Sequence, residues 1–190
     1  DKGNRFRSSG RAVMSNVSDE NGNTSGFRSE LDIMRIKGKF RYRIGHDFAN
    51  ETYDINDFGI SNQNNYNNFT AGVSYEIFVP SKTFNTYSLE LTARHRRLYK
   101  PSVQTRNQIE LDAFFVLPTR FAFGANIEYR SKDDNYFEPR VNGRYVTYGS
   151  QVSGETWLSS DYRKKFALDL RIGYTEYFDN DPRKSHFLNL

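Results

Sequence analysis

The sequence lacks cysteine, and it also lacks any long run of hydrophobic residues. Without cysteine there is no disulfide framework, no thiol nucleophile and no thiolate metal site. No stretch approaches the roughly 18 apolar residues that a membrane-spanning helix needs, and the mean hydropathy is −0.80. These absences exclude a helical membrane protein. They do not exclude a membrane β-barrel, because half of each barrel strand is polar and the average hides the lipid-facing half.

Hydrophobic residues are scarce for a chain that would bury a compact core. They make up 36% of the 190 residues, whereas aromatic residues alone make up 16%. Such a mixture suits surfaces that touch both apolar and wet media. The 27 basic and 23 acidic residues leave a net charge of +4. Because these charges are interleaved along the predicted strands and form no cluster, we expect no nucleic-acid partner.

Residues 35–48 show the clearest two-sided pattern. The odd positions from 35 to 43 all carry Arg or Lys, and the even positions from 36 to 44 carry Ile, Gly, Phe, Tyr and Ile. Successive side chains of a β-strand point to opposite faces, so this segment is predicted to have one cationic face and one apolar face. That division is typical of a membrane barrel strand between lipid and a wet lumen.

Alternation with a period of two recurs along the whole chain and predicts about eight antiparallel strands in one domain, residues 1–190. Most of these segments exceed the mean soluble strand of about five or six residues. They reach the roughly nine to eleven residues that a membrane strand needs. The predicted strands are residues 4–18, 26–48, 67–79, 86–99, 106–117, 120–131, 151–162 and 165–178.

The connections between these strands divide into short and long ones. Short periplasmic turns and long external loops are the expected asymmetry of an outer-membrane barrel with up-and-down strands. Residues 185–190 resemble the beginning of a further strand, so we expect the chain to be a segment of a larger barrel. The short links are residues 19–25, 80–85, 118–119 and 163–164, and the long ones are residues 49–66, 100–105 and 131–150.

Charged residues gather on the polar faces of the predicted strands. Consecutive strands of an up-and-down barrel are neighbours, so acidic side chains can neutralise cations across the lumen. For any single charge, a solvated sheet face is the alternative. The predicted lumen-lining residues are Arg35, Lys37, Lys39, Arg41, Arg43, Glu76, Glu90, Arg94, Glu110, Asp112, Glu128, Asp169 and Arg171.

The two longest loops carry further polar residues that could bind a ligand. The first loop gathers carboxylates that could hold calcium, but it lacks the twelve-residue calcium-loop pattern, which favours a solvated loop with Asx turns. We therefore predict no metal ion and no cofactor. No nucleophile elbow, phosphate-binding loop or zinc motif is present, so no catalytic residue is assigned. The candidate loop-binding residues are Asp54, Asp57, Glu138, Arg140 and Arg144.

Three segments resemble motifs of a large, poorly characterised family of Gram-negative surface proteins. They are YDINDFG at residues 53–59, FEPRVNGRY at 137–145 and SSDYRKK at 159–165. Members of that family join an N-terminal module similar to family-nine carbohydrate-binding modules to a C-terminal outer-membrane β-barrel. The resemblance covers about residues 45–175 and implies location and architecture. It carries over no activity and no catalytic residue.

These observations predict an all-β, antiparallel, up-and-down transmembrane β-barrel in the bacterial outer membrane. We expect a component for transport or surface binding of glycans or peptides, or a subunit of a larger membrane complex. Its expected partners are the lipid bilayer, lipopolysaccharide and other outer-membrane or periplasmic proteins. Two alternatives stay open, namely a soluble β-sandwich that binds carbohydrate and an outer-membrane enzyme.

Overall fold

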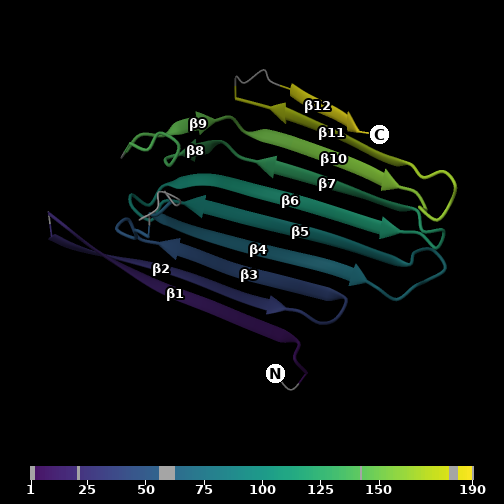
Figure 1. Ribbon diagram of the computed structural model, residues 1–190, viewed down its shortest axis with the longest axis horizontal. Helices are drawn as coiled ribbons and strands as arrows, with labels where there is room; N and C mark the ends of the chain where they lie inside the picture. The colour runs from purple at the N-terminus through teal and green to yellow at the C-terminus, as the bar shows by residue number, and fades with distance from the viewer. Residues whose placement is uncertain (1–2, 21, 56–62, 142, 180–183, 190) are drawn as a thin grey trace.

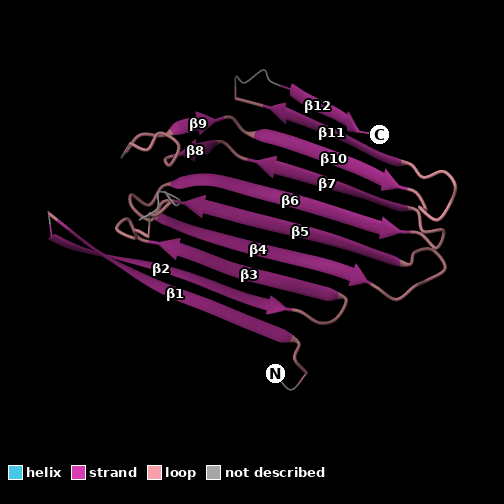
Figure 2. Cartoon of the chain, in the orientation of Figure 1, coloured by secondary structure: helices cyan, strands magenta, loops and turns pink. Residues whose placement is uncertain are grey.

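The computed structural model describes residues 3–20, 22–55, 63–141, 143–179 and 184–189. Ten antiparallel strands follow one another in chain order across a single sheet (Figure 1). The described residues form strands, turns and loops without a helix (Figure 2), and so contain no helix that could cross a membrane. The prediction of an all-β chain with up-and-down antiparallel strands is confirmed.

The sheet has ten strands, where the sequence pattern indicated about eight. A separate pair, β8 (Asp133–Asn135) and β9 (Val146–Tyr148), forms a small arm in the connection from β7 to β10. The ten strands are β1 (Phe6–Asp19), β2 (Gly22–Arg35), β3 (Phe40–Ala49), β4 (Tyr66–Ile77), β5 (Thr86–Arg97), β6 (Gln104–Val116), β7 (Ala122–Arg130), β10 (Gln151–Ser159), β11 (Asp169–Tyr177) and β12 (Lys184–Asn189).

The predicted single strand over residues 26–48 is wrong, because a turn divides it. β2 ends at Arg35 and β3 begins at Phe40. Gly38 lies in the turn with a φ of 93°, a conformation that glycine adopts without a steric penalty. The alternation of cations continues through residues 36–39, but a hairpin turn interrupts the strand that would carry it.

This turn separates the five cations of the segment. Arg41 and Arg43 lie on the polar face of β3, whereas Lys37 and Lys39 lie in the turn. Arg35 lies directly opposite Tyr42, so its position in the strand is on the apolar face. The continuous cationic face predicted for one strand does not form.

The extra turn also rearranges the connections. Residues 36–39, 78–85, 117–121 and 160–168 connect strands at one end of the sheet, here called the turn end. The described residues of the connections from β3 to β4, from β5 to β6 and from β7 to β10 lie at the opposite end, the loop end, on the left of Figure 1. The connection over residues 98–103, predicted to be long, is shorter than those over residues 78–85 and 160–168. The short link between β1 and β2 lies at the loop end as well, and not among the short turns as predicted.

The sheet buries very little apolar surface. The buried hydrophobic residues among those described are Ala49, Tyr53, Tyr66 and Leu98. Residues of the types that usually form a core are instead exposed: Ile44 is 60% exposed and Ile127 is 52% exposed. The sheet is not closed, since its outer strands β1 and β12 each pair with one neighbour only among the described residues.

Candidate functional site: the polar face and the loop end

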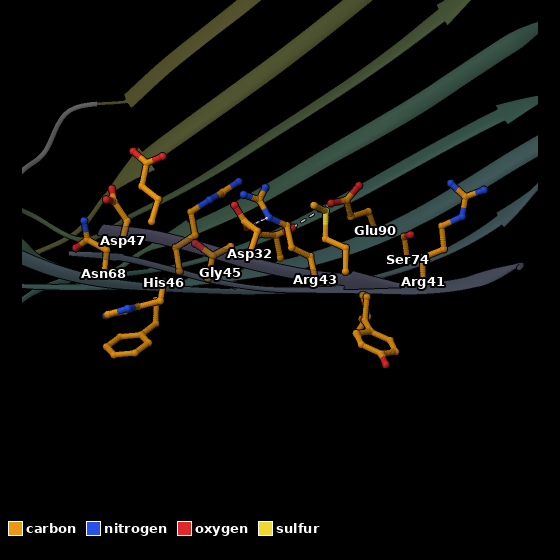
Figure 3. Close-up of a pocket in the computed structure, with 18 of the residues that line it drawn as sticks. Asp32, Arg41, Arg43, Gly45, His46, Asp47, Asn68, Ser74 and Glu90 are labelled. Atoms are coloured by element: carbon orange, nitrogen blue, oxygen red, sulfur yellow. Dashed lines mark hydrogen bonds and ion pairs between the residues drawn. The ribbon is translucent and has the colours of Figure 1, made fainter. Parts of the chain in front are cut away.

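One face of the sheet is hollowed and lined by charged side chains. A hollow of about 780 Å³ lies over β2 to β5. Figure 3 shows Asp32, Arg43 and Glu90 projecting from the sheet on one side, with the other strands rising on that same side. His46 projects from the opposite side (Figure 3). We call the charged side the polar face and the other the apolar face.

Cross-strand ion pairs satisfy most of the charges on the polar face. Arg41 Nη1 lies 2.8 Å from Glu76 Oε2, and Arg43 Nε lies 2.6 Å from Asp32 Oδ1. These pairs join neighbouring strands, as the sequence predicted for an up-and-down sheet. Further cross-strand pairs are Arg28 with Asp47, Arg94 with Glu110, Arg106 with Asp133, and Arg171 with Glu155. Within single strands, Arg28 also pairs with Glu30 and Arg130 pairs with Glu128.

Neutral side chains complete this network around the predicted acidic residues. Asn126 Nδ2 donates to Glu110 Oε1 at 3.1 Å and to Asp112 Oδ1 at 2.7 Å. Gln108 Nε2 donates to Glu128 Oε2 at 2.6 Å. Two other predicted residues have hydroxyl partners: Thr92 Oγ1 donates to Glu90, and the Tyr162 hydroxyl donates to Asp169.

Sequence reasoning missed several members of this network. The missed residues include Asp32, Asp47, Arg106 and Glu155. These residues all lie within segments predicted as strands, but a single strand over residues 26–48 would place Asp32 on the face opposite to Arg43. The turn at residues 36–39 brings Asp32 to the polar face. The signal that could have identified them is the strand register, because it decides which charges lie opposite one another.

At the loop end, the first long loop folds over the polar face. Tyr53 is 5% exposed and packs with Ala49 and Tyr66, and Val13 lies against this cluster. The Asp54 amide donates to Ser15 Oγ at 3.0 Å. A methyl group added at Gly26 would lie 2.2 Å from the Tyr53 Cα, so glycine is required for this close approach.

Three connections meet at the loop end around a cleft of about 910 Å³. Asn65 joins two of them, since its Nδ2 donates to the Lys100 carbonyl at 2.6 Å and its Oδ1 accepts from the Lys100 amide at 2.8 Å. Lys100 Nζ also lies 3.0 Å from Glu51 Oε1, and hydrogen bonding to Glu51 raises the pKa of Lys100. Aromatic side chains of Tyr53, Tyr136 and Phe137 line the same cleft.

The candidate loop-binding residues are only partly brought together. Asp54 and Arg140 both line the cleft. The Glu138 amide donates to Asn135 Oδ1 at 3.1 Å, and the Arg144 amide donates to the Val141 carbonyl at 3.1 Å, but neither residue lines the cleft. Asp57 lies outside the described residues.

The apolar face carries two clusters of aromatic rings at opposite ends of the strands. At the loop end, Phe48 lies 4.9 Å from Tyr99 and His46 lies 4.8 Å from Phe69, measured between ring centroids. At the turn end, ring contacts run from strand to strand over β4 to β7. The turn-end rings are Tyr75, Phe84, Tyr87, Phe115, Phe121 and Phe123.

Aliphatic residues fill the band between these two aromatic clusters. Val73, Leu91, Leu111 and Ile127 lie opposite one another across four consecutive strands, β4 to β7. Leu91 is 45% exposed and Leu111 is 42% exposed, because no other element of the described residues covers this face. The apolar face is therefore arranged as an aliphatic band with an aromatic border at each end.

The described residues hold no group of three or more His, Asp or Glu side chains that could bind a metal ion. His46 and His95 instead hydrogen-bond to amide side chains on the apolar face. The His46 Nε2 to Asn67 Oδ1 distance and the His95 Nδ1 to Asn107 Oδ1 distance are both 2.7 Å.

Comparison with protein families gives one match over the whole chain. The family described as "Domain of unknown function (DUF5916)" matches residues 1–190. No curated protein and no solved structure matches the chain. A family of unknown function agrees with the poorly characterised family that the loop motifs resemble.

Proposed function

The chain belongs to the DUF5916 family, and we propose that its sheet is part of the wall of an outer-membrane β-barrel. The apolar face contacts lipid, and the polar face lines a water-filled interior. The barrel serves transport or surface binding of hydrophilic solutes, by itself or within a larger membrane complex. The strongest support is the contrast between the two faces of one sheet.

The uncovered apolar face is the first argument. Full burial of a Leu or Ile side chain contributes about 1.5–3 kcal/mol, yet Ile33, Ile44 and Ile109 are each 46% exposed or more. Exposed apolar patches of this extent mark a surface that contacts a partner or a membrane. Lipid would cover every strand of this face at once.

The spacing of the aromatic clusters favours lipid over a protein partner. On β5, Tyr87 belongs to the turn-end cluster and His95 contacts the loop-end ring of Phe69. The eight residue steps between them span about 27 Å along the strand, or about 21 Å across a bilayer at a tilt of ~40°. Outer-membrane barrels have an apolar band about 25 Å tall with an aromatic girdle at each interface.

The open edges of the sheet support a larger closed structure. Among the described residues, the outer edges of β1 and β12 have no neighbouring strand, and such edges favour pairing with further strands. Within a bilayer every backbone group must find a partner, so only a closed barrel would be stable there. We therefore propose that additional strands complete the barrel between β12 and β1.

The charge-paired polar face indicates what would pass or bind. Each Arg in a cross-strand pair is neutralised by a carboxylate, so most of the polar face is hydrophilic but has little net charge. Such a wall suits hydrophilic solutes better than it suits a general anion channel. Glycans and peptides are solutes of this class.

Cell fractionation and heat-modifiable gel mobility of the full-length protein test the proposal. We expect the protein in the outer-membrane fraction, with unboiled samples migrating differently from boiled ones. A monomer that is soluble without detergent and whose mobility does not change on heating would contradict the barrel. It would favour the soluble carbohydrate-binding alternative. Hydrolysis of a lipid or glycan by the purified barrel would instead favour the enzyme alternative.

A further inference from the structure

Four arginines meet on the polar face where β5, β6 and β7 approach the loop end. Arg96 on β5 lies directly opposite Arg106 on β6, and Arg130 on β7 lies opposite Gln108, two residues from Arg106. Arg94 precedes Arg96 by two residues on the same face of β5. Like charges directly opposite one another on neighbouring strands destabilise a sheet unless counter-charges compensate them.

Three of these four arginines have a carboxylate partner. Arg94 Nη1 lies 2.6 Å from Glu110, Arg106 Nη1 lies 3.0 Å from Asp133, and Arg130 Nη2 lies 2.7 Å from Glu128. For Arg96, the described residues provide no hydrogen bond and no ion pair. Asp133 attracts it only at longer range, and Arg106 lies directly opposite it in the register. The cluster therefore carries one cation more than its acidic partners neutralise.

The cluster also holds donor atoms without an acceptor. The Nε atoms of Arg106 and Arg130 are buried, and neither has a hydrogen-bond partner in the part of the chain that the structure describes. A buried N–H without a partner costs about 1–3 kcal/mol. A bound anion would supply acceptors for the free guanidinium and for such donors together.

A small cavity lies beside this pair of arginines. It has a volume of about 110 Å³, and Asn68 and Thr105 are among the residues that line it. Its charged lining residues are Arg96, Arg97, Arg106, Asp133 and Asp134, which leave one positive charge in excess. That space holds several water molecules or a group the size of a carboxylate or phosphate. The amide of Asn68 and the hydroxyl of Thr105 add neutral hydrogen-bonding groups to the two guanidinium groups.

The cavity lies between the two larger spaces of the molecule. It shares Asn68 and Arg96 with the hollow of the polar face, and it shares Leu98 and Phe137 with the loop-end cleft. Gln63 lines all three. A solute that moves from the loop end to the polar face would therefore pass the arginine pair.

We propose that Arg96 and Arg106 form a binding site for the carboxylate or phosphate group of a water-soluble solute. The proposal rests on the proposed function, since the polar face must be open to water for the solute to arrive. The rest of the solute occupies the adjacent hollow, whose charges are already paired. The single excess cation selects a solute with one acidic group over a neutral one.

Titration calorimetry on the purified full-length protein at low ionic strength tests the site. The probes are inorganic phosphate, acetate and glycerol phosphate, with glycerol as the neutral control. We expect saturable binding of the three anions and none of glycerol. In Arg96→Gln the affinity for the anions falls by about tenfold or more, because a charge-assisted hydrogen bond is lost.

Arg171→Gln is the matched control. It removes the same charge from the polar face, but on β11, where Arg171 is paired with Glu155. Its anion affinity is expected to stay within about twofold of the unmodified protein. Equal loss in both variants, unchanged binding in Arg96→Gln, or no saturable binding in the unmodified protein would each overturn the site.

Stability gives a second readout that does not depend on the probes. Without anion, Arg96→Gln is expected to unfold at a higher temperature than the unmodified protein, because the repulsion between Arg96 and Arg106 is removed. Phosphate then raises the unfolding temperature of the unmodified protein but not of Arg96→Gln. Stabilisation of both proteins to the same degree would contradict the proposal.

Two further outcomes separate this site from its alternatives. The purified protein is held in detergent micelles, to which an anionic lipid can be added. If this lipid displaces phosphate, the ligand is a lipid headgroup and the assignment to a water-soluble solute is wrong. If fractionation and gel mobility contradict the barrel while Arg96 still determines anion affinity, the proposed function fails and the site stands. A barrel that does not bind the anions contradicts the site alone.

Discussion

The side chains on the two faces of this sheet differ in how far other parts of the chain provide their contacts. On the polar face, charges find partners on the next strand, and a loop packs over its end with Tyr53 buried. On the apolar face, side chains touch their neighbours along the sheet but nothing among the described residues covers them. One face is therefore largely complete within the chain, whereas the other depends on a surrounding medium.

The largest expected effect comes from placing a charge in the centre of the apolar face. If lipid covers this face, Leu111→Arg destabilises the full-length protein by about 2–4 kcal/mol, the depth-dependent cost of Arg near the bilayer midplane. Leu111 lies opposite Leu91 and Ile127, so no acidic residue is directly paired with the new cation. The measurement is the free energy of unfolding by denaturant in lipid vesicles.

Asn126→Arg provides the matched control on the polar face. Asn126 already donates to Glu110 and Asp112, and an arginine there has two carboxylates within reach. We expect a change below about 1 kcal/mol, as for partly exposed ion pairs. Equal costs for both variants would remove the distinction between the faces.

An intermediate effect is expected from adding a methyl group at Gly26 on the polar face. Gly26→Ala would bring the new Cβ within 2.5 Å of the Thr52 carbonyl oxygen. Relieving this clash requires the backbone to move, which is energetically costly. Overpacking of this kind costs about 1–3 kcal/mol. The measurement is again the free energy of unfolding, with proteolysis of the loop at residues 50–55 as a local readout.

Gly154→Ala is its counterpart on the apolar face. Gly154 lies opposite Ile127, and an added Cβ there has no atom within 4 Å. We expect a neutral or slightly stabilising change, since alanine restricts the unfolded chain more than glycine does. A larger loss in Gly154→Ala than in Gly26→Ala would show that the loop is not packed against the polar face.

The smallest effect is expected in a turn that belongs to neither face. Asp161 accepts hydrogen bonds from Arg163 Nε at 2.8 Å and Nη2 at 2.6 Å, and these hold the pKa of Asp161 well below its usual range. Because the folded-state pKa is lowered, this stabilisation is present above the unfolded pKa of about 3.9 and is lost as the pH falls below it. The unfolding free energies of the unmodified protein and Asp161→Asn should therefore differ at pH 7, and this difference should shrink as the pH falls below about 4. A difference that grows on acidification would contradict this assignment.

The alternation of residue types predicted most strands and the face on which each side chain lies. It failed at residues 36–39, because a turn with Gly38 can interrupt a strand without changing the period of the charges. It also gave no indication that Trp157 packs on the polar side of Gly124, where an added Cβ would lie 2.7 Å from the indole nitrogen. Alternation records polarity, whereas these contacts depend on shape and register.

The charged pairs were only partly predictable for the same reason. The sequence indicated that acidic strands lie near basic ones, and Glu76 and Glu110 do pair with Arg41 and Arg94. It could not indicate that Arg96 lies opposite Arg106, because a shift of one residue in register moves every side chain to the other face. Register depends on turn lengths and on contacts between distant segments.

The sequence by itself determined that this chain forms long antiparallel strands with one apolar and one charged face, because that division follows from a local period of two. The tertiary structure decided which charges are paired, where the first long loop packs and where Arg96 lies opposite Arg106 without an ion pair among the described residues. These properties come from strand register and from loops that meet across the loop end. They depend on residues far apart in the chain, so no local pattern specifies them.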